Sequence, residues 1–177
     1  MNRLVLGLVL FVGLVSAYRE FRPGPKFNKG GDSVQVARLN SDGTVAHEQF
    51  QPRLAPYLAV YHGASWCGPC QAFSPQLAEF FHDADKTKGR FQLLMVNYDH
   101  NDADMVAYMR QHKMEFPAVR RGESGAWGAS TGNGIPNLMI IDTATGKVVS
   151  SSFDGSTYVG CDAPLRVLRT IIAKGRP

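Results

Sequence analysis

The sequence predicts an α/β fold in which helices cover both faces of a mixed sheet. The first observation is a short apolar run, Ala59 to Gly63, followed by a CxxC pair and then by apolar residues at helical spacing. The second is the same strand-then-helix order over residues 91–112. The third is a hairpin pattern over residues 138–151, with an amphipathic segment at 165–172 behind it. Strands that alternate with helices are typical of α/β domains.

The segment from Trp66 to Cys70 carries the clearest chemical signal. At the start of a helix, unpaired backbone N–H groups favour a thiolate over a thiol, so Cys67 is the expected nucleophile and Cys70 the resolving thiol. Gly68 lets a substrate backbone approach closely, and Pro69 fits a first helical turn, where its missing N–H costs nothing. Trp66 is expected to offer a flat apolar surface to a substrate polypeptide.

Two other uses of the CxxC pair remain open. A zinc site needs a second pair of ligands, and the chain offers only Cys161 and five scattered histidines. A purely structural disulfide is the other use, although Gly68 and Pro69 between the cysteines add little to stability. We expect no metal and no organic cofactor.

The pentapeptide WCGPC, with Pro75 in the helix behind it, resembles the thioredoxin superfamily. Four further segments are similar to its tryparedoxin/nucleoredoxin branch, namely residues 61–67, 96–99, 134–138 and 142–147. The resemblance covers residues 50–173. It implies a thioredoxin-like mixed sheet and thiol–disulfide exchange with protein clients.

The resemblance also implies a cis-proline at Ile135-Pro136 that lies against the CxxC pair. The backbone of Ile135 would then pair with the substrate strand beside Cys67, which makes both residues of the dipeptide substrate-binding candidates.

The proton acceptor for Cys70 is not given by the resemblance. Tyr61 stands where many thioredoxins carry a buried aspartate. Asp99 follows the second central strand, whose end should face the motif, and is the candidate acceptor. We expect the neighbouring His100 to be a surface turn residue, and His62 to lie in the core or on a face of the sheet.

Residues 1–17 are predicted to be a secretory signal. Arg3 supplies the charged start, residues 4–15 the apolar core, and Val15-Ser16-Ala17 the small-residue cleavage site. Cleavage near Ala17 would export the protein to the periplasm or the medium. An uncleaved N-terminal membrane anchor is the alternative.

The rest of the chain is predicted to be a linker, residues 18–32, and one thioredoxin-like domain, residues 33–177. An N-terminal β-hairpin extension (33–39 and 44–47) should cover an edge of the main sheet. The expected core elements are strands at 58–63, 91–97, 138–141 and 147–151, a motif helix to about residue 87, a helix that Asp102 caps, and a final helix. Residues 114–134 are expected to be loop-rich around Trp127, and Cys161 to be a half-buried free thiol near the last helix.

Charge and composition restrict the function. The net charge is +4, but basic residues are scattered, so nucleic-acid binding has little support.

The surroundings of Cys67 predict the direction of the reaction. No Lys or Arg lies within five residues of Cys67, so we expect a thiol pKa of about 7 and a protein that acts as a reductant. An exported reductant implies a membrane-borne electron donor. A membrane-tethered reductase for cytochrome c maturation and a non-catalytic binding module stay open as alternatives.

Overall fold

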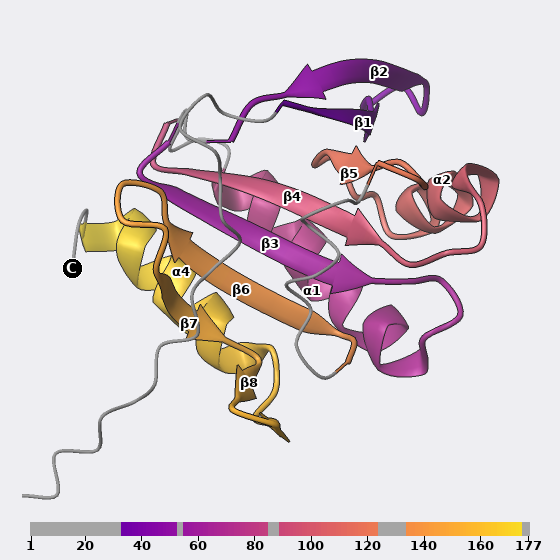
Figure 1. Cartoon of the computed structure of the whole chain (residues 1–177). Helices are drawn as coiled ribbons and strands as arrows, with labels where there is room; N and C mark the ends of the chain where they lie inside the picture. Colours follow the sequence, from indigo (N-terminus) through magenta and orange to yellow (C-terminus); the bar gives the residue numbers. More distant parts are fainter. Residues whose placement is uncertain (1–32, 53–54, 85–88, 124–133, 175–177) are drawn as a thin grey trace, which may run out of the picture.

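The computed structural model describes residues 33–52, 55–84, 89–123 and 134–174 (Figure 1). The elements are β1 (Val34–Leu39), β2 (Val45–Phe50), β3 (Tyr57–Gly63), α1 (Gly68–Ala84), β4 (Phe91–Asn97), α2 (Asp102–Gln111), β5 (Ala118–Val119), β6 (Asn137–Asp142), β7 (Val148–Ser151), β8 (Phe153–Asp154), β9 (Thr157–Tyr158) and α4 (Asp162–Lys174). None of the helices in these ranges combines the length and the apolar character that a membrane crossing requires.

The main sheet has the order β2-β1-β5-β4-β3-β6-β7, and β8 pairs with β9 separately. β4 runs parallel to its neighbours β3 and β5, whereas β6 is antiparallel to both β3 and β7. The predicted mixed sheet is therefore confirmed. β3 and β4 lie in the middle of the sheet (Figure 1), and every residue of β3 is buried, which explains its continuous apolar sequence.

The core divides at the sheet because alternate residues of a strand point to opposite faces. From β3, Tyr57, Ala59 and Tyr61 belong to the larger cluster, and Leu58 and Val60 belong to the smaller one. Side chains of α1, α2 and α4 all join the larger cluster. Within the described ranges, the buried members of the smaller cluster come from strands.

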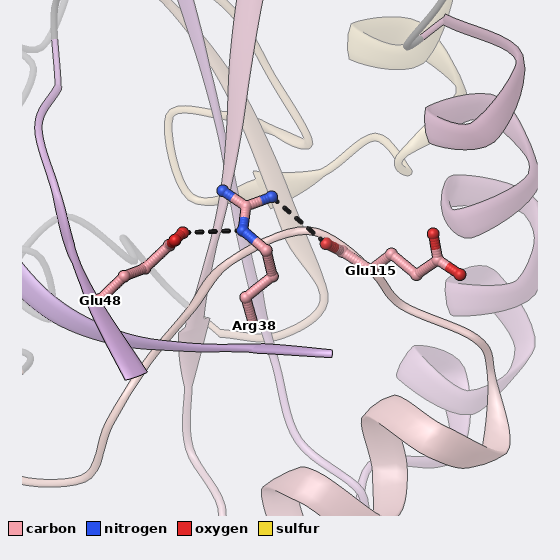
Figure 2. Close-up of polar contacts among 3 residues, drawn as sticks. All are labelled: Arg38, Glu48 and Glu115. Atoms are coloured by element: carbon pink, nitrogen blue, oxygen red, sulfur yellow. Dashed lines mark hydrogen bonds and ion pairs between the residues drawn. The ribbon is translucent and has the colours of Figure 1, made fainter. Parts of the chain in front are cut away.

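The N-terminal hairpin extends the main sheet, as predicted. β1 pairs antiparallel with β2 along its whole length and with β5 at two positions, so the hairpin lies over that edge of the sheet. Figure 2 shows how one side chain fastens it: Arg38 Nε donates to Glu48 Oε1 at 2.7 Å, and its guanidinium reaches the backbone oxygen of Glu115 at 3.4 Å. The return strand runs to Phe50, beyond the expected end at His47.

The N-cap of α2 lies one residue before Asp102, the predicted cap. Asn101 is the N-cap: its backbone is extended, and its side chain accepts from the backbone N–H of Asp104 at 2.8 Å. The carboxylate of Asp102 instead accepts from Arg120 Nε and from the backbone N–H of Arg121, both at 2.8 Å. Asp102 therefore ties the start of α2 to the segment after β5.

Three short strands were not predicted. β5 lies in the stretch expected to be loop-rich, and β8 and β9 form a small hairpin before α4. Each has two residues, too few for a periodic pattern. Trp127, around which this stretch was expected to be loop-rich, lies outside the described residues.

Candidate active site

Cys67 and Cys70 form a disulfide at the N-terminus of α1, with their Cα atoms 5.2 Å apart. Cys67 comes directly before the first helical residue, and its sulfur accepts from the backbone N–H of Cys70 at 3.2 Å. Cys67 is 6% exposed and Cys70 is fully buried at 0%. Cys67 is therefore the more exposed cysteine of the pair, and the backbone N–H of Cys70 is in position to hold its thiolate.

The indole of Trp66 makes an open face beside the disulfide. It is 59% exposed, donates through Nε1 to the backbone oxygen of Tyr98 at 3.1 Å, and stacks on the ring of His100. His100 is exposed in the turn after β4, as expected. Gly68 and Pro69 are exposed too, and a Cβ added at Gly68 would meet nothing within 4 Å. A polypeptide can therefore approach the disulfide from this side.

The Ile135–Pro136 peptide bond is cis, as predicted. In the β3–β6 register Asn137 pairs with His62, so the dipeptide lies beside the end of β3, where the chain turns into the motif. Ile135 is half-buried and packs on the core cluster that contains both motif cysteines. The role of the dipeptide in binding a substrate strand stays a prediction.

Asp99 reaches the turn before the disulfide. Its Oδ1 accepts from the backbone N–H of Ser65 at 2.8 Å and from the Ser65 hydroxyl at 2.6 Å. The residue is 4% exposed, and its Oδ2 is buried without a hydrogen-bond partner among the described residues. The predicted place of Asp99 near the motif is therefore correct, while its role as proton acceptor stays a prediction.

A buried hydroxyl cluster, formed by Tyr61, Ser74 and Tyr108, lies under the second cysteine and was not predicted. The hydroxyl of Tyr61 is 3.0 Å from Ser74 Oγ, 3.5 Å from the hydroxyl of Tyr108 and 3.5 Å from the backbone oxygen of Cys70. A further hydrogen bond joins Ser74 to Tyr108. Burial raises the pKa of Tyr61 and of Tyr108, so both hydroxyls keep their protons at neutral pH.

Cys161 is a buried free thiol at the start of α4. Its sulfur accepts from the hydroxyl of Ser152 at 3.1 Å and lies 3.8 Å from that of Tyr158. Burial raises the pKa of the Cys161 thiol, which makes it a poor nucleophile at neutral pH. Within the described ranges, no group of three or more His, Cys, Asp or Glu side chains is arranged to hold a metal ion.

His62 is buried in the sheet, as expected. Its Nδ1 lies 3.4 Å from the hydroxyl of Tyr98, and burial lowers the pKa of the imidazole to about 3. The ring is therefore neutral at physiological pH and cannot supply a positive charge to the thiolate.

The family model described as Thioredoxin-like matches residues 56–148, more than half of the chain. The chain therefore belongs to the thioredoxin-like family. Among curated relatives it is 31% identical over 94 residues to the tryparedoxin of Trypanosoma brucei brucei, covering 52% of this chain and 65% of the relative. It is 33% identical over 103 residues to the probable nucleoredoxin 1 of Arabidopsis thaliana, covering 56% and 17%. The predicted resemblance to tryparedoxins and nucleoredoxins is confirmed, and the chain spans less than two thirds of the length of each of these relatives.

Solved structures agree with this assignment. Tryparedoxin II complexed with glutathionylspermidine superposes with a TM-score of 0.56 at 25% identity, over 82% of this chain and 92% of the other. The thioredoxin of Wuchereria bancrofti superposes with a TM-score of 0.55 at 25% identity, over 79% and 94%.

Proposed function

We propose that the protein is a thiol–disulfide oxidoreductase that reduces disulfides in protein clients. One observation carries the proposal: Cys67, the more exposed cysteine of the pair, lies directly before α1, is joined to the fully buried Cys70, and is bordered by the exposed indole of Trp66. This arrangement provides an attacking thiolate, a resolving thiol and a surface for a polypeptide.

The reaction follows from the geometry of the two cysteines. The Cys67 thiolate attacks one client sulfur, so the client disulfide breaks and a mixed disulfide forms, while the other client sulfur leaves as a thiolate and takes up a proton. Cys70 then loses its proton, for which Asp99 is the candidate acceptor, and attacks Cys67. The client leaves as a dithiol, and the two electrons it gained are those lost when the Cys67–Cys70 disulfide forms.

The proposal that the protein reduces its clients, rather than oxidising them, rests on the small number of interactions that stabilise the Cys67 thiolate. In the described part of the chain, the hydrogen bond that reaches Cys67 Sγ comes from the backbone N–H of Cys70, and Pro69 has no N–H to add. A strong oxidant needs a thiolate that is held by several interactions, so the pair is better suited to a reductant.

Turnover with insulin tests the proposed function. In the presence of dithiothreitol, the wild-type protein should accelerate precipitation of the insulin B chain. Cys161→Ser should do so equally, because burial raises the pKa of the Cys161 thiol and leaves it a poor nucleophile. Precipitation no faster than with dithiothreitol alone would favour a non-catalytic binding module.

We further propose that the protein is exported after cleavage near Ala17 and is re-reduced by a membrane-borne donor. The support is the charged start, the apolar run and the small residues of the first 17 positions. Intact-mass analysis of the exported protein should show a chain that begins at Tyr18. A chain that begins at Met1 and sediments with membranes would instead indicate an anchor, and would favour a tethered reductase for cytochrome c maturation.

A further inference from the structure

The turn between β3 and α1 is held from two sides through Ser65. From the end of β4, Asp99 Oδ1 accepts from the Ser65 backbone N–H and hydroxyl at 2.8 and 2.6 Å. From α1, Gln71 Nε2 donates to the Ser65 backbone oxygen at 2.5 Å. Both peptide groups of Ser65 are therefore fixed by side chains from different elements.

Gln71 is itself held by the end of α2. Its Oε1 accepts from Gln111 Nε2 at 3.3 Å and pairs with His112 Nε2. Since an amide oxygen can only accept, His112 must donate from Nε2. These contacts leave the amide nitrogen of Gln71 to face Ser65. The His112 ring also packs edge-on against Tyr108, with ring centroids 5.1 Å apart.

The turn that Ser65 belongs to ends at the nucleophile. The backbone N–H of Cys67 donates to the oxygen of Ala64 at 3.2 Å, so Ser65 and Trp66 are the central residues of a tight turn. The carbonyl that Gln71 holds belongs to the peptide between these two residues. Rotation of that peptide would move both the indole of Trp66 and the sulfur of Cys67.

We propose that Gln71 is a positioning residue that acts through Ser65 to keep Cys67 and Trp66 in their reactive arrangement. The inference rests on the proposed function, because Cys67 needs a reactive arrangement only if it exchanges disulfides. The hydrogen bonds that support the inference are present without any client. Without the Gln71 donor, the central peptide of the turn gains alternative orientations. The Cys67 thiolate then spends less time near the helix N–H groups and the Cys70 N–H that stabilise it.

The test compares Gln71→Met with Gln76→Met. Methionine keeps the length of glutamine but has no donor, and Gln76 is an exposed residue of the same helix. The rate at which iodoacetamide alkylates Cys67 is measured against pH in the fully reduced protein. For Gln71→Met we expect a profile shifted to higher pH and a rate near pH 7 lower by about 2- to 10-fold, the effect of one hydrogen bond. Gln76→Met should match the wild type.

Two further controls separate the possible outcomes. His112→Phe retains the Gln71 donor but loosens it, so a smaller shift of the same sign is expected. A global loss of structure would also expose Cys161, so unchanged alkylation of Cys161 shows that the fold is intact. If the profile of Gln71→Met is unshifted while the wild type turns over insulin normally, the positioning role of Gln71 is overturned and the proposed function stands. A shifted profile in a protein without turnover would support the positioning role and refute the proposed function.

Discussion

Cys67→Ser should abolish insulin turnover, with a loss of at least about 1,000-fold, and Cys70→Ser should leave the protein covalently attached to its client. Serine is not ionised near neutral pH and cannot replace the thiolate as the attacking group. With Cys70 replaced, the first attack should still occur, because Cys67 is the more exposed cysteine of the pair. No second thiol is then at hand to release the client.

Non-reducing electrophoresis followed by intact-mass measurement would detect the trapped species, and dithiothreitol should release it. Cys161→Ser is the matched control, since it removes a thiol without touching the motif. If Cys67→Ser trapped clients and Cys70→Ser did not, the two roles would be reversed.

Acid should destabilise the protein strongly through His62. The pKa of this imidazole is lowered by burial to about 3 in the folded protein, against about 6.5 in an unfolded chain. Between these values the unfolded state binds the extra proton, so stability that is present above pH 6.5 is lost as the pH falls toward 3. The slope should approach about 1.4 kcal/mol for each pH unit and amount to several kcal/mol in total.

Urea unfolding at several pH values between 4 and 7 would measure this slope. His62→Phe should flatten it, whatever the variant does to stability at neutral pH. Burial lowers the pKa of His112 too, so that residue contributes in the same direction, and His112→Phe is the comparison that separates the two. An equal slope in His62→Phe and the wild type would show that His62 does not set the acid limit.

The central strands could be predicted closely because their signal is local. The expected strand at 91–97 coincides with β4, and the expected 58–63 differs from β3 by one residue. Both lie in the middle of the sheet, and burial imposes long apolar runs on them. β5 could not be found this way, because its two residues are strand only through partners such as Val36, far away in the chain.

The same distinction applies to the site. The two cysteines and the cis bond before Pro136 belong to contiguous motifs, and Asp99 was placed because parallel strands end at the same edge of the sheet. The hydroxyl cluster was missed because its three residues come from three elements. A weak signal existed: Ser74 falls on the buried side of α1, beside Phe73 and close to Leu77. The bond from Gln71 to Ser65 left no pattern in the sequence.

The short pairing between β1 and β5 has a consequence for local unfolding of the protein. In the sheet, the N-terminal hairpin is attached through two register pairs, Val36 with Val119 and Ala37 with Ala118, whereas β3 and β4 are paired over seven. Arg38 adds contacts to Glu48 within the hairpin and to Glu115 outside it (Figure 2). Buried side chains such as Val36 and a hydrogen bond from Arg110 Nε to the backbone oxygen of Gly43 at 3.3 Å hold the hairpin as well. Because its backbone pairing to the rest of the sheet is so short, we expect the hairpin to open as one unit at a lower free energy than global unfolding. Its amides should exchange with solvent through this sub-global opening, while those of β3 and β4 wait for the whole domain to unfold.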